Sequence, residues 1–306
     1  MVTTLLWIPA TILAGALQAW RTAVQRRASQ NLSVNGAGFV RYLYGLPVTI
    51  VLLTAYRLLF PEPMPAFGAY FLPFCIGAGI AQILATNLLI MAFAHRNFVV
   101  GTAYSKTEAV QGALLSMLLL GEHLSLLTWL GIGCGVVGVM ILSTGGKRMG
   151  PVDFLKSLSQ PAALYGIASG SLFALTAIGV RRATQEIATP QHVHAALIVL
   201  VVTVTLQTMM QGGYLLMREP REIRNVLRNW RLGSQVGILS SVASACWFSG
   251  FATAPTALVR IVGQVEVLFT MALGHFYLRE KMARSEAAGL LLVAAGVVTA
   301  LAGSLI

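Results

Sequence analysis

The sequence predicts an all-α integral membrane protein with ten transmembrane helices arranged as two inverted five-helix repeats. Its composition, its apolar stretches and an internal repeat all support this fold class. Hydrophobic residues make up 57% of the 306 residues and charged residues only 10%, which does not fit the water-exposed surface of a soluble chain of this length. Because one bilayer-crossing helix needs ~20 apolar residues, ten of them would use roughly 200 residues. We therefore expect no sizeable soluble domain.

Ten apolar stretches, separated by short connections, are the expected membrane helices. They cover residues 5–20, 36–59, 71–93, 99–119, 126–142, 163–180, 195–216, 236–254, 257–278 and 287–306. The basic residues near the first stretch follow it, whereas a cleaved signal peptide has its positive charge before the apolar core. We therefore interpret the first stretch as a retained membrane anchor.

Lysine and arginine residues are unevenly distributed between alternate connections. If all ten stretches cross the membrane, one side holds Arg57, Arg181 and Arg182, whereas the other side holds fifteen basic residues. The positive-inside rule places the basic-rich side in the cytoplasm and both termini outside, in a bacterial-style cytoplasmic (inner) membrane. Membrane lipids with anionic head groups, and not nucleic acid, are the expected partners of these charges. The fifteen residues are Arg21, Arg26, Arg27, Arg96, Lys147, Arg148, Lys156, Arg218, Arg221, Arg224, Arg228, Arg231, Arg279, Lys281 and Arg284.

The two halves of the chain resemble each other. Glu108 matches Glu266 at an offset of 158 residues, and RRASQ (26–30) matches RRATQ (181–185) at an offset of 155. Because five is an odd number, the second repeat must enter the membrane from the opposite side. Inverted repeats are typical of secondary transporters, which bind substrate near the midplane between the repeats. We divide the chain into a first repeat (1–145), a linker (146–160) and a second repeat (161–306).

The end of each half has a common pattern, visible in the segments 105–142 and 263–301. Each segment contains a glutamate, a run of small residues and leucines, a polar turn and a glycine-spaced last helix. This pattern resembles the EamA-like members of the drug/metabolite transporter superfamily, and the resemblance covers essentially the whole chain. It implies a small-molecule permease, often an exporter, with a central cavity lined by stretches 1, 3, 4, 6, 8 and 9.

The chain departs from the family pattern in three respects. Ala109 and Val267 stand where proline is common, which removes the usual cause of a kink in the fourth and ninth stretches. The second repeat reads LREK at 278–281, where the family has a leucine, glycine, glutamate signature. The family also usually keeps its termini in the cytoplasm, opposite to the result of the charge count.

Glu108 and Glu266 are the strongest candidates for a functional site. Each lies about ten residues into its stretch, close to the bilayer centre, where an acidic side chain costs ~2.5 to 3.5 kcal/mol on insertion scales. We predict that they bind a cationic or zwitterionic group of the substrate, or that one of them carries a coupling proton. The alternative is a structural role, with each carboxyl group buried and neutral or hydrogen-bonded to a neighbouring helix. We expect no metal site and no cofactor beyond a coupled proton.

Further substrate-binding candidates lie near the two glutamates in the sequence. Tyr104, Glu108 and Gln111 follow the i, i+4, i+7 spacing of one helix face. Lys106 is equally deep, and its counterpart in the second repeat is Gln264. Because residues i and i+2 do not share a helix face, we expect no direct pairing of Lys106 with Glu108.

Several residues in other stretches complete the predicted site. Trp20, Asn87 and Trp247 lie in stretches that the family resemblance places around the cavity, and so do Gln18, Gln82 and Ser244. Arg41 and Arg260 lie near the starts of the second and ninth stretches. We interpret both arginines as interfacial anchors, with a gating role or substrate-carboxylate binding as the alternative.

These features predict a secondary-active transporter of the drug/metabolite type, not an enzyme. It would move a small organic solute such as an amino acid, an amine or a drug by alternating access, in the direction of export. A flippase for a lipid-linked or other amphiphile, or an importer on the same fold, is the alternative. An intramembrane enzyme is remote, because ASGS (168–171) and His275 match a serine-protease dyad only weakly. Glycine spacings in stretches 5 and 10 indicate packing within one chain, with a homodimer surface as the alternative.

Overall fold

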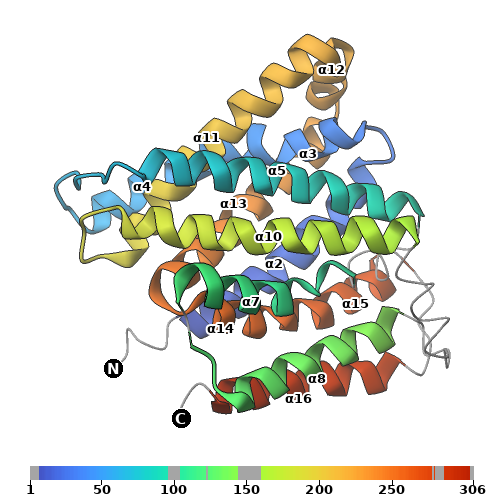
Figure 1. The fold of residues 1–306 in the computed structure, drawn as a ribbon. Coiled ribbons are helices and arrows are strands. Elements are labelled where there is room, and N and C mark those ends of the chain that lie inside the picture. Colours follow the sequence, from blue (N-terminus) through green and yellow to red (C-terminus); the bar gives the residue numbers. More distant parts are fainter. Residues whose placement is uncertain are drawn as a thin grey trace.

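The computed structural model of this chain is a bundle of helices (Figure 1). It describes residues 7–95, 104–121, 123–143, 160–277, 279 and 286–303. Within this part of the chain, the β-pairing consists of one isolated bridge between Phe67 and Ile187. The predicted all-α class is therefore confirmed. The predicted linker, apart from residue 160, lies outside the described residues.

Helices cover part or all of every predicted apolar stretch. In the first half they are α2 (Trp7–Ala28), α3 (Val34–Leu43), α4 (Gly45–Leu59), α5 (Phe71–His95), α7 (Glu108–Leu120) and α8 (Leu126–Ser143). In the second half they are α10 (Pro161–Gln185), α11 (His192–Arg218), α12 (Pro220–Arg228), α13 (Trp230–Thr253), α14 (Thr256–Val262), η1 (Gly263–Val265), α15 (Glu266–Phe276) and α16 (Glu286–Gly303).

Six spans in the described part of the chain are long and apolar enough to cross a membrane. They comprise α3 with α4, α5, α10, α11, α13, and α14 through α15. Shorter apolar helices lie at Glu108–Leu120, Leu126–Gly138 and Leu291–Ala300. The chain is thus a multi-pass membrane protein, whereas the number of ten crossings stays a prediction.

The helix axes run between two ends of the bundle, and equivalent helices of the two halves run in opposite directions. Figure 1 shows α2 beginning at the end where both termini lie, whereas its counterpart α10 begins at the opposite end. The connections 60–70 and 186–191 lie at the termini end, and the connections 29–33 and 219–229 lie at the other. This arrangement is the one that an inverted pair of repeats requires.

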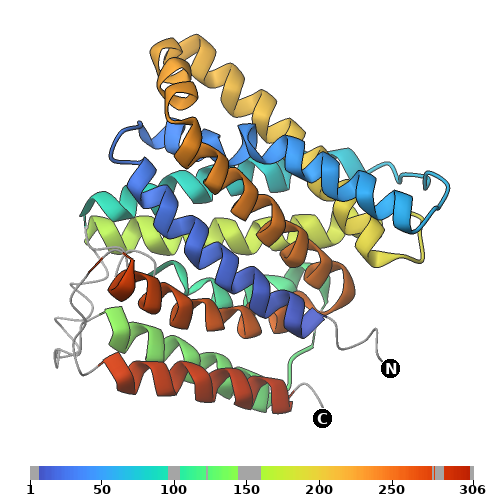
Figure 2. The same ribbon diagram turned by 180° about the vertical axis from the view of Figure 1, so that it is seen from behind.

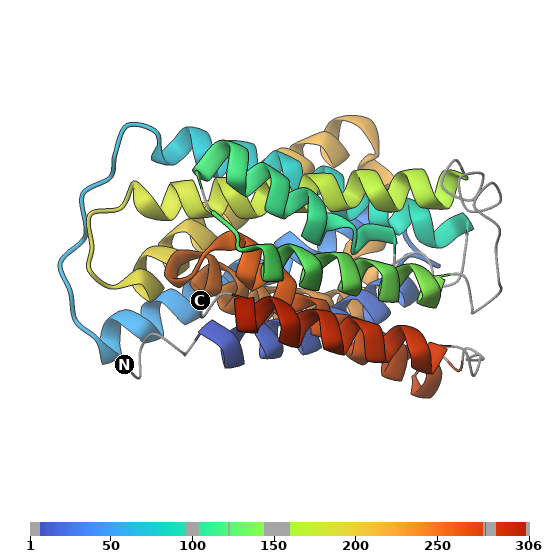
Figure 3. The same cartoon turned by 60° about the horizontal axis from the view of Figure 1, so that its bottom comes forward.

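Helices of the two halves pack against each other in equivalent pairs, so each contact has a counterpart in which the halves are exchanged. Helix α2 lies along α13, and its equivalent α10 lies along α5 (Figure 2). Helix α7 packs on α14, and α8 lies beside α16 (Figure 3). Each half therefore covers surface of the other, and the centre of the bundle lies between them.

Close contact between α8 and α16 depends on glycine. A methyl group on Gly131 would lie 2.5 Å from the backbone nitrogen of Ala300, and one on Gly138 would lie 2.7 Å from the carbonyl oxygen of Gly289. The two backbones therefore touch where side chains would separate them. The prediction that these glycines pack within one chain is confirmed, and a homodimer surface stays untested.

Helix α2 is longer than the first predicted stretch and corrects the charge count at one position. It continues to Ala28, so Arg21 lies inside the helix, where it is only 1% exposed. The predicted stretch ends before Arg21, whereas the helix accommodates this arginine in its buried face. The basic-rich side keeps fourteen of the fifteen counted residues, and the orientation of the termini stays a prediction.

Candidate functional site

Two helix interruptions place both predicted glutamates at the starts of short helices. Residues Lys106 and Thr107 form a turn before α7 begins at Glu108, and the 3₁₀ turn η1 precedes α15, which begins at Glu266. An acidic residue in the first turn is favoured by the helix dipole. Interrupted helices are also a typical feature of transporter binding sites. The same break thus recurs at equivalent positions of the two repeats.

A threonine, not a proline, accompanies the break in the first repeat. The Thr107 hydroxyl group donates to the carbonyl oxygen of Tyr104 at 2.9 Å, and the Thr107 backbone N–H donates to the same oxygen at 3.3 Å. This oxygen would otherwise accept the N–H of Glu108 in a continuous α-helix. The break therefore needs no proline at position 109, contrary to the expectation from the family pattern.

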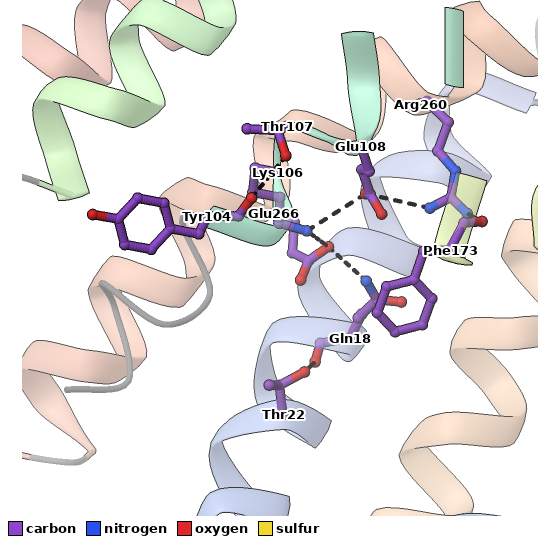
Figure 4. A network of polar contacts seen from close by, with 9 residues as sticks. All are labelled: Gln18, Thr22, Tyr104, Lys106, Thr107, Glu108, Phe173, Arg260 and Glu266. Atoms are coloured by element: carbon purple, nitrogen blue, oxygen red, sulfur yellow. Dashed lines mark hydrogen bonds and ion pairs between the residues drawn. The ribbon is translucent and has the colours of Figure 1, made fainter. Parts of the chain in front are cut away.

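Four charged side chains meet between the two halves (Figure 4). The Lys106 ammonium nitrogen lies 2.6 Å from Glu266 Oε2 and 3.9 Å from Glu108 Oε1. Arg260 Nη1 lies 3.3 Å from Glu108 Oε1. Two cations and two carboxylates therefore form a charged cluster without formal net charge, which we call the ion cluster. It brings together four of the residues predicted from the sequence.

The ion cluster is buried and receives hydrogen bonds from neighbouring helices. All four side chains belong to residues between 2% and 6% exposed. Gln18 Nε2 on α2 donates to Glu266 Oε2 at 2.7 Å, and Arg260 Nη2 donates to the backbone oxygen of Phe173 on α10 at 2.7 Å. Such additional bonds are needed, because buried ion pairs lose the hydration of both charges.

The contact between Lys106 and Glu108 was not expected from their spacing. The expectation assumed one continuous helix, in which residues i and i+2 point to different faces. In the structure, residues 106 and 107 form a turn between two helical segments, and both side chains reach the same cluster. The expectation was therefore wrong for a local reason that the sequence pattern did not reveal.

Aromatic rings cover the guanidinium group of Arg260. Its central carbon lies 5.4 Å from the Trp247 ring centroid and 5.0 Å from that of Phe251, and the two rings stack at 5.8 Å. Cation–π contacts of this kind stabilise a desolvated cation. Arg260 therefore lies inside the bundle and is not an interfacial anchor. Trp247, a predicted substrate-binding residue, contacts the ion cluster through Arg260, and its indole N–H has no acceptor among the described residues.

Arg41 is also buried, at 6% exposure. Its Nη1 donates to the Thr86 hydroxyl oxygen at 3.3 Å and its Nη2 to the Ser244 hydroxyl oxygen at 3.2 Å. These contacts connect α3 with α5 and α13. An anchor at the membrane surface would keep its charge in water, so the anchor interpretation is also wrong for Arg41.

Three predicted residues of the same two segments turn away from the ion cluster. The Tyr104 ring points away from it (Figure 4). Gln111 Nε2 donates to the Thr107 hydroxyl oxygen at 3.2 Å. Gln264 lies against α8, where a methyl group on Gly135 would come within 2.3 Å of its Oε1. The predicted stripe of Tyr104, Glu108 and Gln111 does not form, because the helix is interrupted within it.

Trp20 and Asn87 also lie away from the ion cluster. Trp20 is 50% exposed on the outside of the bundle. Asn87 donates its side-chain N–H to Asn35 Oδ1 at 3.0 Å and lines a groove of about 360 Å³ between α3, α5 and α11. Membership of a cavity-lining stretch does not specify the helix face, so it could not distinguish these residues from Trp247.

Two residues near the site were not predicted from the sequence. Phe251 follows Trp247 at i+4, a spacing that places two aromatic rings on one helix face and could have revealed it. Arg21 was assigned to a connection, although Gln18, Arg21 and Gln25 follow helical spacing in a segment of small and apolar residues.

The fold and the ion cluster define a multi-pass helical membrane protein built from two repeats. The chain belongs to the EamA-like transporter family, whose model matches residues 5–144 and 160–302. This family comprises membrane transporters of the drug/metabolite type. A solved crystal structure shares the fold, with a TM-score of 0.67, 16% sequence identity, and coverage of 97% of this chain and 98% of the other. None of the curated proteins matches the chain.

Proposed function

We propose that this protein is a secondary-active transporter that moves a small organic solute, such as an amino acid, an amine or a drug, across the cytoplasmic membrane in the direction of export. The ion cluster is its substrate and coupling site. The observation that carries this proposal is that both ion pairs connect the repeats. Glu266 of the second repeat binds Lys106 of the first, and Glu108 of the first binds Arg260 of the second.

Cross-repeat ion pairs couple the position of one half to that of the other. In alternating access, one repeat rocks against its partner around a central site. Such a movement separates charges that lie in different repeats, and an unpaired buried charge costs several kcal/mol. A charged solute that occupies a carboxylate or a cation while the pairs separate would lower this cost. The ion cluster therefore offers a physical basis for coupling substrate binding to movement.

A proton can act on the same pairs. Protonation of Glu266 removes the negative charge that holds Lys106 at 2.6 Å. The released ammonium group would then be free to move to Glu108, which is 3.9 Å away. We therefore include proton coupling at the two glutamates in the proposed mechanism.

Transport by proteoliposomes tests the proposal. Wild-type protein should exchange at least one labelled solute from a panel of amino acids, polyamines, quaternary amines and organic acids. Glu108→Gln and Glu266→Gln should each lower the exchange at least tenfold, because each removes one member of a cross-repeat pair. Glu186→Gln is the matched control, because Glu186 accepts a backbone N–H of Tyr70 far from the cluster, and a glutamine can accept it too. Full exchange by both cluster variants would refute the assigned site.

A further inference from the structure

The interior holds two cations that the ion cluster does not neutralise. The buried lysine and arginine residues in the described part of the chain are Lys106, Arg260, Arg21 and Arg41. Lys106 and Arg260 have carboxylate partners. Arg21 and Arg41 have none among the described residues, although they are 1% and 6% exposed.

Arg21 belongs to a polar stripe on α2 that begins at the ion cluster. Gln18, one turn before Arg21, donates to Glu266. Arg21 Nη1 donates to Gln25 Oε1 at 2.8 Å, and Gln25 Nε2 donates to the carbonyl oxygen of Ala37 on α3 at 2.6 Å. The stripe therefore leads from Glu266 past Arg21 to α3.

Arg41 lies on α3, where the polar stripe of α2 ends. It follows Ala37 by one helical turn on α3, and its guanidinium group reaches the hydroxyl groups of Thr86 and Ser244. The hydrogen bond from Gln25 to Ala37 joins α2 to α3, with Arg21 one turn before Gln25 and Arg41 one turn after Ala37. Because α3 follows α2 through a short turn and runs back along it, the two arginines lie on the same side of this contact.

Neutral partners leave most of the donor capacity of these arginines unused. A guanidinium group has five N–H donors, and Arg21 donates one side-chain hydrogen bond and Arg41 two within the described residues. All of these acceptors are neutral. Buried charges are normally paired, because desolvation without a counter-charge is costly. Two unpaired guanidinium groups therefore indicate an anion that the described residues do not supply.

We propose that Arg21 and Arg41 form a subsite for the carboxylate group of the transported solute. Guanidinium groups bind carboxylates through paired, charge-assisted hydrogen bonds. The ammonium group of the same solute takes the place of Lys106 at Glu266, about 4.5 Å further along α2, since Gln18 precedes Arg21 by three residues. The inference rests on the proposed function and makes the solute a zwitterion of amino-acid type.

Melting temperatures of the purified full-length protein in detergent test the subsite. The probes are the common amino acids and their carboxamides, which keep the ammonium group and lack the carboxylate. At least one amino acid should stabilise the wild type with an affinity at least tenfold higher than its amide. Arg21→Gln and Arg41→Gln should abolish this difference, and Arg41→Lys should retain part of it. Arg228→Gln, a matched loss of an exposed arginine on α12, should keep it in full.

Two further results separate the inference from its alternatives. If chloride stabilises the protein relative to gluconate and no amino acid exceeds its amide, the subsite holds an inorganic anion and the proposal is overturned. If Glu266→Gln abolishes transport while both arginine variants transport normally, the result supports the proposed function and refutes the carboxylate subsite at Arg21 and Arg41. Arginine-dependent binding of an amino acid without any transport would instead support the subsite and refute the transport function.

Discussion

Lys106 is the cation of the ion cluster that contacts both carboxylates, one from each repeat. It lies 2.6 Å from Glu266 and 3.9 Å from Glu108. The equivalent position of the second repeat is Gln264, which turns toward α8 and has no hydrogen-bond partner for its side-chain amide in the described residues. The two glutamates of the ion cluster are therefore duplicated between the repeats, whereas its two cations are not.

Replacement of Lys106 by glutamine should destabilise the protein by about 3 kcal/mol, because it leaves Glu266 buried without its cation. The double variant Lys106→Gln with Glu266→Gln should recover part of this loss, since both charges are then absent. Melting temperatures in detergent measure both effects, with Arg228→Gln as the exposed control. A double variant that is no more stable than Lys106→Gln alone would argue against a direct pair.

The sequence identified the four residues of the ion cluster as candidates, but it did not identify which of them pair. Repeat alignment placed Glu108 and Glu266 at equivalent positions, which is sufficient to predict that they lie near the axis between the halves. The pairing of Lys106 with Glu108 depends on the hydrogen bonds of Thr107 to Tyr104. A helical wheel cannot represent such a break. Arg21 was missed for a different reason, since the first stretch was ended at Trp20, although α2 continues to Ala28.

At the scale of the helices, the contact between α8 and α16 shows how glycine sets the distance between two elements. Gly131 faces the backbone of α16, whereas Gly133 on the same helix has no neighbouring atom within 4 Å of an added methyl group. The two positions are two residues apart and differ only in what they face. Their contrast allows packing to be separated from helix propensity.

Gly131→Ala should lower the stability by roughly 1 to 3 kcal/mol, because the new methyl group overlaps the α16 backbone. Gly133→Ala should leave the stability unchanged or raise it slightly, since alanine is the better helix former and meets no obstacle. Thermal unfolding of the two variants side by side measures the difference. Equal melting temperatures would show that the two helices do not pack as closely as described.

Helix positions were largely predictable from apolar stretches, and helix interruptions were not. The predicted stretch 36–59 is divided into α3 and α4 near Tyr44, and the stretch 257–278 is divided by η1. Both divisions leave the hydropathy of the segment unchanged, so a composition-based boundary cannot detect them. The second of these interruptions separates Arg260 on α14 from Glu266 at the start of α15.

At the scale of the whole molecule, the uneven distribution of basic residues between the two ends of the bundle predicts its orientation in the membrane. The described connection 219–229 carries three arginines at the end of the bundle opposite the termini, and Arg218 precedes it at the end of α11. The three are Arg221, Arg224 and Arg228. From the positive-inside rule we predict that this end lies in the cytoplasm and that both termini lie outside.

A C-terminal fusion tests this orientation. Alkaline phosphatase fused after Ile306 should be active, because this enzyme folds only outside the cytoplasm. Green fluorescent protein at the same position should not fluoresce, because it does not fold when it is exported unfolded across the membrane. Exchanging the two reporters provides the internal control. A fluorescent fusion with inactive phosphatase would place the termini in the cytoplasm, in agreement with the general habit of the family.

The unequal pair Lys106 and Gln264 has a consequence for the energies of the two transport states. If the two halves were identical, the outward-facing and inward-facing states would be related by exchange of the halves and would be equally populated. The salt bridge from Lys106 to Glu266 has no equal in the exchanged arrangement, where Gln264 would face Glu108. Under the proposed alternating-access mechanism, this unequal pair would contribute to unequal energies of the two states, and the empty carrier would rest on one preferred side.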